Sequence, residues 1–423
     1  MQVIADFHTH SRFAMACSSA ITIRGMEISA VEKGISLIGT GDFTHGAWLS
    51  ELKDNLESDK DTGLFRIKNS DSNVRFILSG EVSTIFTGND KKVKKIHHII
   101  TFPDFGSLDS LRDILKKYGS LESDGRPQLS MSAAALVEEV FKISNDAFVF
   151  PAHAWTPYFG VFGSLSGFDS MKDAYEDQEK HIFALETGLS SDPPMNWRIS
   201  ALDKYALLSN SDMHSLPKLG REANVFEIEP DKFNYKNIIE IIKKKDGKHL
   251  KRTIEFYPEE GKYHFDGHKD CKFSVDPSNS SISVCKICGK KLVIGVMHRI
   301  NDLADRPVGF VPKDSIPYVN LVPLIEVIAY SMRKNTYSPS VNAQYIKLLE
   351  KVGKEFDILM NVDLEAIKEN SSEEIAQAVG NVRNNKITII PGYAGVFGEI
   401  DLLNREKPKD NKIRQKGLFD NIS

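Results

Sequence analysis

Histidine and carboxylate side chains stand at the ends of seven short apolar runs in the first half of the chain. A continuous apolar run of this kind is typical of a strand buried on both faces of a parallel sheet. The residues at the run ends are His8 with His10, Asp42 with His45, Glu81, His97 with His98, His153, Glu186, and Asp212 with His214. Because residues just past the strands of a closed parallel barrel meet at one rim, we expect these side chains to converge. Such a set would bind hard or borderline metal ions, and it indicates a metal-dependent hydrolase.

The spacing inside two of these motifs adds detail. His8 and His10 are two residues apart, as are Asp212 and His214, so each pair faces one side of an extended strand. His97 and His98 are adjacent, so only one of them should point inward. Metal ions in such a site lower the pKa of a water molecule and neutralise phosphate charge, which is the chemistry of phosphoester hydrolysis. Asp212 would either bind a metal ion or orient the nucleophile.

These side chains need a scaffold in which helices alternate with strands. Helices are predicted over residues 22–33, capped by Thr22 and closed by Gly34, over 107–117, and over 133–141 after Ser130 or Ser132. Strands and helices in this rhythm predict βα units. Three further helices are predicted over 324–332, 341–356 and 371–384, with a hairpin near 386–398.

The composition divides the 423 residues into four parts. Residues 1–250 form the predicted α/β catalytic barrel, and residues 251–300 form a small module. Residues 301–403 form a mainly helical domain, and residues 404–423 form a charged tail that we expect to be disordered.

The small module carries a second group of possible metal ligands. His268 and Cys271 are separated by a 13-residue loop from Cys285 and Cys288, which form a Cys-x-x-Cys pair. This spacing predicts one tetrahedral structural zinc ion, which would hold together a segment too polar to build its own core.

Charge and hydropathy limit the cellular locations and the binding partners that we expect for this protein. The net charge of −4 argues against a protein coated for nonspecific nucleic-acid binding. One local basic stretch, Lys243, Lys244 and Lys245, would either contact DNA or form a solvated helix face. No apolar stretch reaches the ~20 residues that span a bilayer, and the first strand begins too near Met1 for a signal peptide. We therefore expect no membrane partner and a cytoplasmic protein, associated with the nucleoid if prokaryotic.

The strand-end motifs resemble the PHP (polymerase and histidinol phosphatase) superfamily. The matching segments are 6–10, 39–42, 80–81, 96–97, 151–153, Glu186 and 211–214. The resemblance implies a distorted seven-stranded βα barrel that binds up to three metal ions and hydrolyses phosphoesters. The implied ions are Zn²⁺, with Mg²⁺ or Mn²⁺ as further candidates. The implied ligands are His8, His10, Asp42, Glu81, His97, His153, Glu186, Asp212 and His214, of which His10, Glu81 and Asp212 would be catalytic.

Two departures from the superfamily pattern leave the ligand set open. Residues 11–16 contain no His or Asp, although many members place a metal ligand there. Phe43 follows Asp42 where many relatives have His, and His45 is a possible substitute. The pattern of a His after a β-branched residue favours His97 over His98.

Nearly the whole chain resembles one family of this superfamily, endonuclease Q. The likeness includes residues 41–45 with Trp48, residues 81–85, the 267–288 finger, residues 294–299 and 306–310, and residues 391–398. It implies a DNA repair nuclease that recognises uracil, hypoxanthine, xanthine or abasic sites. Cleavage on the 5′ side of the lesion would leave a 3′-hydroxyl and a 5′-phosphate.

Several residues are candidates for contact with DNA or with a second protein. Arg12, Lys218 and Arg221 would pair with phosphate oxygens or form surface ion pairs. Trp155, Tyr158 and Phe159 lie on an aromatic loop that would wedge the helix open, wall a base pocket or cap the barrel. The C-terminal residues Gln415, Leu418 and Phe419 resemble the peptide that docks repair enzymes on a PCNA-type sliding clamp, although Asn421 stands where an aromatic residue is usual.

Two other interpretations stay open. A small-molecule phosphatase like histidinol phosphatase would explain the barrel but leave the zinc module, the basic stretch and the C-terminal peptide unused. A noncatalytic nucleic-acid-binding protein would use the cluster only to stabilise its fold.

Overall fold

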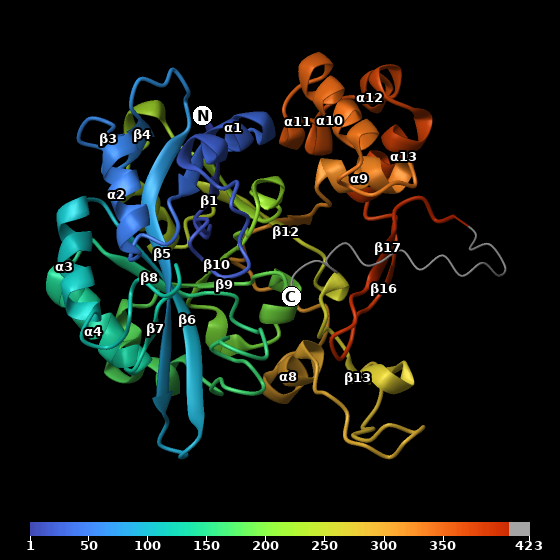
Figure 1. Cartoon of the computed structure of the whole chain (residues 1–423). Helices are drawn as coiled ribbons and strands as arrows, with labels where there is room; N and C mark the ends of the chain where they lie inside the picture. The colour runs from blue at the N-terminus through green and yellow to red at the C-terminus, as the bar shows by residue number, and fades with distance from the viewer. Residues whose placement is uncertain (406–423) are drawn as a thin grey trace.

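The computed structural model describes residues 1–405, which form a mixed α/β fold (Figure 1). Its main sheet contains β1 (Gln2–Asp6), β2 (Leu37–Gly39), β3 (Leu56–Ser58), β4 (Phe65–Ile67), β5 (Arg75–Thr87), β6 (Val93–Phe102), β7 (Gln128–Leu129), β8 (Phe148–Pro151), β11 (Ala223–Glu227), β12 (Leu250–Glu255) and β15 (Tyr318–Asn320). The order is β15-β12-β11-β1-β2-β5-β4-β3, with β6 and β7 paired to β5 and β8 paired to β6.

The strand directions agree with the sequence prediction only in part. β1, β2 and β5 run parallel, and so do β9 (Ala184–Glu186) and β10 (Ala206–Leu208). However, β11 is antiparallel to β1, and β6 is antiparallel to β5 and β8. The expectation of a wholly parallel sheet is therefore wrong. Only residues 88–92 join β5 to β6, and so short a link permits an antiparallel return, whereas a parallel crossover needs about a dozen residues.

The closed seven-stranded barrel that the sequence predicts is not confirmed. Within residues 1–405, β9 and β10 pair with each other and with no third strand, so backbone pairing does not complete a ring. The main sheet also includes β12 and β15, so it crosses the domain boundary predicted at residue 250.

Helices follow several of the strands, and some of their ends carry the caps that the sequence predicts. They are α1 (Ile23–Lys33), α2 (Gly46–Asn55), α3 (Phe105–Leu115), α4 (Ala133–Ile143), α5 (Met171–Tyr175), α6 (Pro193–Asn196) and α7 (Tyr235–Lys243). The Thr22 side chain accepts a hydrogen bond from Gly25 N at the start of α1, and Gly34 ends the helix in the left-handed conformation. Ser132, rather than Ser130, caps α4. Figure 1 shows α3 and α4 stacked at one side of the sheet.

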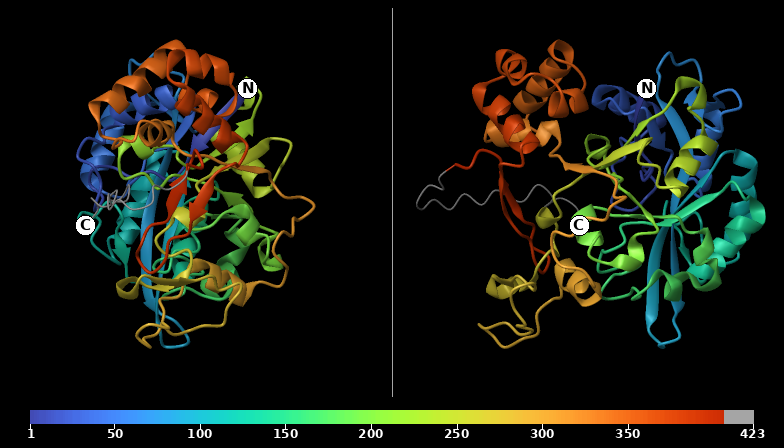
Figure 2. Two further views of the ribbon diagram at one scale, coloured as in Figure 1. Left: turned by 90° about the vertical axis from the view of Figure 1, so that its right-hand side faces the viewer. Right: turned by 180° about the vertical axis from the view of Figure 1, so that it is seen from behind.

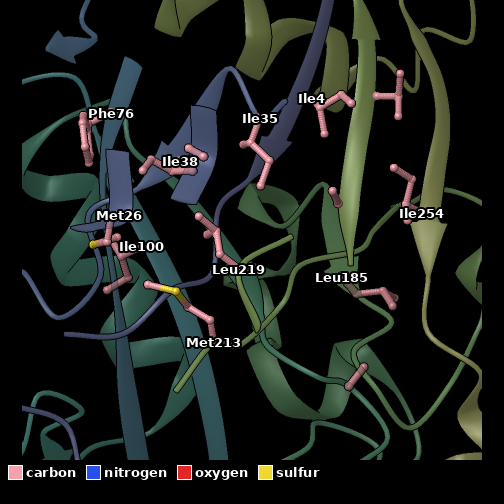
Figure 3. Close-up of a cluster of buried hydrophobic side chains, with 14 of the residues drawn as sticks. Ile4, Met26, Ile35, Ile38, Phe76, Ile100, Leu185, Met213, Leu219 and Ile254 are labelled. Carbon is pink, nitrogen blue, oxygen red and sulfur yellow. The ribbon is translucent and has the colours of Figure 1, made fainter. Parts of the chain in front are cut away.

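Buried aliphatic and aromatic side chains from strands far apart in the sequence fix the sheet against these helices. Figure 3 shows Ile4 of β1, Ile38 of β2, Phe76 of β5, Leu185 of β9 and Ile254 of β12 in one cluster. Burying each such side chain stabilises the fold by about 1.5–3 kcal/mol. The strand ends are therefore held in fixed positions, which is what a multi-ligand site requires.

The second half of the chain lies along one side of this sheet (Figures 1 and 2). A small module with β13 (Asp266–His268), β14 (Phe273–Val275) and α8 (Val296–Leu303) occupies one end. The helices α9 (Leu324–Ser331), α10 (Pro339–Lys351), α11 (Glu355–Met360), α12 (Leu364–Asn370) and α13 (Glu373–Arg383) gather at the other end. The predicted hairpin is present as β16 (Thr388–Ile390) and β17 (Glu399–Asp401), and it lies between them.

The single helix predicted over residues 341–356 is instead two helices. α10 ends at Lys351 and α11 begins at Glu355. Gly353, with φ of 143°, interrupts the helical conformation between them, because this backbone conformation is incompatible with a continuing right-handed helix. The helical spacing of apolar residues continues across this interruption, so the sequence pattern did not predict two separate helices.

Two further predictions concern membranes and the C-terminal end. Among residues 1–405, no helix is long and apolar enough to cross a bilayer. The proposed clamp-binding residues Gln415, Leu418 and Phe419 lie outside the described residues, and the clamp contact stays a prediction.

Candidate active site

The strand-end histidines and carboxylates converge on one buried cluster. Three groups of three residues bring their ligand atoms within 4.8 Å of one another: His8, His10 and Glu81; His10, Asp212 and His214; and Glu81, His97 and His153. His10 and Glu81 each belong to two groups. The three groups therefore overlap, as ligands shared between neighbouring ions would.

Glu81 and Asp212 are the carboxylates at the centre of the cluster. Glu81 Oε1 lies 2.7 Å from His97 Nδ1 and 3.1 Å from His153 Nε2, and Glu81 Oε2 lies 3.5 Å from His10 Nε2. Asp212 Oδ1 lies 2.9 Å from His10 Nε2 and 3.6 Å from His214 Nδ1. Each carboxylate thus approaches at least two imidazoles.

Two buried atoms of this cluster have no hydrogen-bond partner among the described residues, and this bears on whether metal ions fit. They are His8 Nε2 and Glu81 Oε2. An unpaired buried polar atom is costly and rare in folded proteins. Divalent ions would satisfy both atoms, and an imidazole–carboxylate donor set suits Zn²⁺ or Mn²⁺. The residues therefore fit a divalent metal cluster.

Charge interactions within the cluster are strong. Burial disfavours protonated His10, but Asp42 and Asp212 outweigh that cost and raise the pKa of its imidazole to about 9. Burial also disfavours ionised Glu81, yet His97 and His8 hold its pKa well below the ordinary value. Because metal binding needs a neutral imidazole, an ion at His10 would displace a proton.

Glu186 and Asp42 orient the two histidines of the first strand. Glu186 Oε1 lies 3.0 Å from His8 Nδ1, and Asp42 Oδ1 lies 2.8 Å from His10 Nδ1. Glu186 Oε1 also accepts a hydrogen bond from His153 N at 2.9 Å. Among the described residues, neither carboxylate belongs to any of the three metal-competent groups. Such contacts fix the ring orientation, so that the Nε2 atoms of His8 and His10 face the central carboxylates of the cluster. Direct ligation by Glu186 or Asp42 stays a prediction.

The backbone is strained where three of these residues leave their strands. Asp42, His153 and Asp212 have φ of 43°, 29° and 47°, in the left-handed region that non-glycine residues avoid. Gly188, also left-handed, packs so closely on His153 that an added Cβ would lie 2.6 Å from the His153 Cβ. Strain of this kind persists where the surrounding packing enforces it, and it clusters at functional sites.

The structure shows which of the histidines His97, His98 and His45 face the cluster, a point that the sequence did not decide. His97 faces Glu81, whereas His98 points to the opposite face, where Thr84 Oγ1 lies 2.9 Å from its Nε2 and Tyr175 OH lies 3.0 Å from its Nδ1. His45 lies outside the three groups, and its ring stacks on Phe13 with centroids 4.4 Å apart.

Three of the predicted phosphate-binding residues are engaged within the protein. Arg12 forms a two-pronged pair with Glu51, and Lys218 Nζ lies 2.6 Å from Glu326 Oε1. Arg221 is buried and donates to the carbonyl oxygens of Ser211 and Asp212. These contacts favour the ion-pair and structural alternatives for all three.

The aromatic loop divides into a buried part and an exposed part. Trp155 is 1% exposed and donates a hydrogen bond to Asn196 Oδ1, so it is a core residue and cannot contact DNA in this conformation. Tyr158 is 55% exposed. The Phe159 ring packs on the His97 ring with centroids 4.3 Å apart. The loop therefore reaches from the cluster to the solvent.

The basic stretch lies at the end of α7. Lys243 Nζ lies 5.4 Å from the Phe183 ring centroid, Lys244 pairs with Glu240, and Lys245 donates to the Asp203 carbonyl. Lys244 and Lys245 also line a cavity of about 880 Å³.

The four residues of the predicted zinc site come together. The ligand atoms of His268, Cys271, Cys285 and Cys288 lie within 4.8 Å of one another, with Cys288 Sγ 3.6 Å from His268 Nδ1. A Cys₃His set is typical of a closed structural zinc site.

One residue at the cluster was not expected from the sequence. Arg126 lies between α3 and β7, and its Nε is 3.8 Å from Glu81 Oε2. It follows no apolar run and belongs to no motif, so the only local signal is a single basic residue in a Gly- and Ser-containing loop.

Parts of this chain are similar to proteins known from their sequences. A family model described as the MJ0043 C-terminal domain matches residues 323–386. The protein MJ0043 of Methanocaldococcus jannaschii is 31% identical over 254 residues, which cover 59% of this chain but only 31% of MJ0043. YqxK of Bacillus subtilis is 26% identical over 94% of this chain and 99% of its own length.

Two solved structures are similar over nearly the whole chain. The crystal structure of the lesion-specific endonuclease PfuEndoQ from Pyrococcus furiosus has a TM-score of 0.83 and 33% identity, and the match covers 96% of this chain and 98% of that one. Endonuclease Q in complex with a 27-mer duplex substrate with an abasic lesion at the active site has a TM-score of 0.82 and 33% identity. That match covers 96% of this chain and 99% of the other.

Proposed function

Because this chain belongs to the endonuclease Q family, we propose that it is a metal-dependent DNA repair endonuclease. It hydrolyses the phosphodiester on the 5′ side of deaminated bases (uracil, hypoxanthine or xanthine) or abasic sites and leaves a 3′-hydroxyl and a 5′-phosphate. The observation that carries the proposal is the set of three overlapping metal-competent groups in a chain that aligns along its length with a lesion-specific endonuclease.

The chain's own residues would hold and orient the reacting groups. His8, His10, Glu81, His97, His153, Asp212 and His214 would bind Zn²⁺, with Mg²⁺ or Mn²⁺ as alternatives, and Glu186 and Asp42 would fix the imidazoles of His8 and His10. Divalent ions bound there would activate water and neutralise the phosphate. Asp212, whose side chain is 24% exposed, would hold the attacking water, and the side chains of His10 and Glu81 are fully buried.

Access to a damaged base requires that the base leave the stack. The exposed Tyr158 and the adjacent Phe159 lie on one loop, and Phe159 touches the cluster histidine His97. We propose that this loop walls the pocket for the extruded nucleotide. Changing both residues to Ala should alter the relative rates on uracil and abasic duplexes, and unchanged relative rates would exclude the pocket.

Two further contacts belong to the proposal. Lys244 and Lys245 would contact flanking DNA phosphates, since both line an open cavity at the surface. The zinc module would carry one structural Zn²⁺ on His268, Cys271, Cys285 and Cys288.

A sliding clamp is a proposed second protein partner, and this proposal rests on the C-terminal sequence alone. Deletion of residues 415–422 should abolish clamp co-elution without changing the nicking of free DNA.

The deciding experiment uses end-labelled duplexes with one uracil, hypoxanthine or abasic site in the presence of Mg²⁺, Mn²⁺ or Zn²⁺. The expected result is a single nick immediately 5′ of the lesion, absent from undamaged DNA and from Asp212→Asn. Asp113→Asn serves as the control and should nick normally, because Asp113 is an exposed residue of α3 that pairs with Lys116 and belongs to none of the three groups. Release of phosphate from small monoesters without any nick would instead identify a metabolic phosphatase.

A further inference from the structure

Residues 122–127 form a loop that brings a guanidinium to the cluster. Arg126 Nε lies 3.8 Å from Glu81 Oε2, and the Arg126 side chain is 19% exposed. Within residues 1–405, the one hydrogen bond that this guanidinium donates goes to the Met15 carbonyl, at 3.3 Å. Most of its five N–H donors are therefore not committed to a protein acceptor.

Other arginines in this half of the chain are paired much more closely. Arg12 Nη1 lies 3.1 Å from Glu51 Oε1, and Arg112 Nη2 lies 2.9 Å from Glu122 Oε1. A guanidinium placed for stability alone normally makes such a charge-assisted contact. Arg126 forms an ion pair with Glu81 at 3.8 Å, which is beyond hydrogen-bond distance, so this contact leaves its N–H donors available.

The cation is nevertheless strongly favoured at this position. An arginine side chain keeps its proton throughout the ordinary pH range, and the Glu81 carboxylate lies 3.8 Å from Arg126 Nε. Arg126 is thus a permanent positive charge beside the two central carboxylates of the cluster. An anionic ligand that enters the cluster would meet this charge at the rim.

The loop is also fixed in place. Asp124 accepts a hydrogen bond from Met15 N at 3.0 Å, and Gly125 N donates to the Phe13 carbonyl at 3.1 Å. An added Cβ on Gly125 would lie 2.5 Å from the Asp42 carboxylate, so the loop packs directly on the residue that orients His10. Since the loop is held from both sides, the guanidinium is preorganised for a ligand.

We propose that Arg126 contacts a non-bridging oxygen of the scissile phosphate when DNA occupies the cluster. This inference rests on the proposed function and extends it to one residue. A planar guanidinium offers two parallel N–H groups to a phosphate and supports the charge that builds up on its oxygens during hydrolysis. Arg126 is suited to this contact because it is partly exposed beside Glu81 and because most of its N–H donors are uncommitted.

The test compares Arg126→Gln and Arg126→Lys with Arg112→Gln in the metal-loaded protein. Arg112 is a matched control because it is another largely buried arginine, paired with Glu122 of the same loop and in no contact with the cluster. The readouts are the single-turnover nicking rate at saturating enzyme, the metal content, the melting temperature, and the affinity for nicked duplex with a 5′-phosphate or a 5′-hydroxyl.

Arg126→Gln should lower the nicking rate by about 10²–10³-fold, the usual cost of one lost oxyanion donor, with metal content and melting temperature unchanged. The preference for the 5′-phosphate product should fall about tenfold, Arg126→Lys should recover part of both losses, and Arg112→Gln should behave as wild type. The inference is overturned if Arg126→Gln nicks at the wild-type rate, or if it loses metal ions, because Arg126 would then only stabilise the cluster. A wild-type protein that binds metal but nicks no lesion would refute the proposed function instead.

Discussion

Glu81 belongs to two of the three metal-competent groups, and its replacement should therefore remove more than one ion. Glu81→Gln keeps the size of the side chain but removes its charge. The Glu81 carboxylate approaches four imidazoles at 2.7 to 3.7 Å, those of His97, His153, His8 and His10. We expect the bound-metal count to fall by two from the wild-type value.

His214 supplies the comparison, because it belongs to one group only. His214→Gln should lower the metal count by one. Metal content per chain would be measured by plasma emission after dialysis against a weak chelator, with protein concentration from amino-acid analysis. The geometry thus predicts a two-to-one ratio of losses between Glu81→Gln and His214→Gln.

Glu186→Gln is the matched control for charge and burial. Glu186 is as buried as Glu81 and also contacts His8, but it lies outside all three groups. An orienting carboxylate typically contributes 10–100-fold to metal affinity, so Glu186→Gln should keep its metal count and bind about 10–100-fold more weakly in a competitive titration. If Glu186→Gln lost as many ions as Glu81→Gln, Glu186 would be a direct ligand and the reasoning from the three groups would fail.

Three further predictions concern stability. Lys33→Met should cost about 3–5 kcal/mol in denaturant unfolding, because it leaves Glu355 buried without its 2.8 Å partner; an unchanged midpoint would contradict this. Burial raises the pKa of Glu255 to about 8 from 4.5, so the folded state holds a proton that the unfolded state releases. Stability should therefore fall as pH rises from 4.5 to 8, and Glu255→Gln, measured by thermal unfolding across that range, should flatten the fall. Cys285→Ser should lower the zinc content by one and speed proteolysis between residues 268 and 291, because the metal would hold this segment together; an unchanged zinc content would contradict the assignment.

Local sequence signals predicted many individual elements correctly. The caps Thr22 and Gly34 bounded α1, and the apolar runs located β1, β2, β8 and β10. These signals depend on residues within one turn or one strand, where backbone hydrogen bonding and side-chain periodicity act directly. They did not predict strand direction at β6 or the break at Gly353, because the same apolar pattern suits either strand direction and continues across a helix break.

The sequence by itself determined the chemistry available to this protein. Imidazole and carboxylate groups recur at strand ends, and a Cys₃His set lies in the later module, so possible metal-binding sites could be predicted without coordinates. A local pattern can locate the end of a strand because an apolar run stops where the buried, paired part of the backbone stops.

Only the tertiary structure decided which of these side chains contact one another. His10 meets Asp212 across 202 residues of sequence, Glu186 turns to His8 across 178, and Arg126 reaches Glu81 from a loop without any motif. Such contacts depend on strand order, register and the packing of the whole core. No local window of sequence contains both partners, so their distances arise only when the chain is folded.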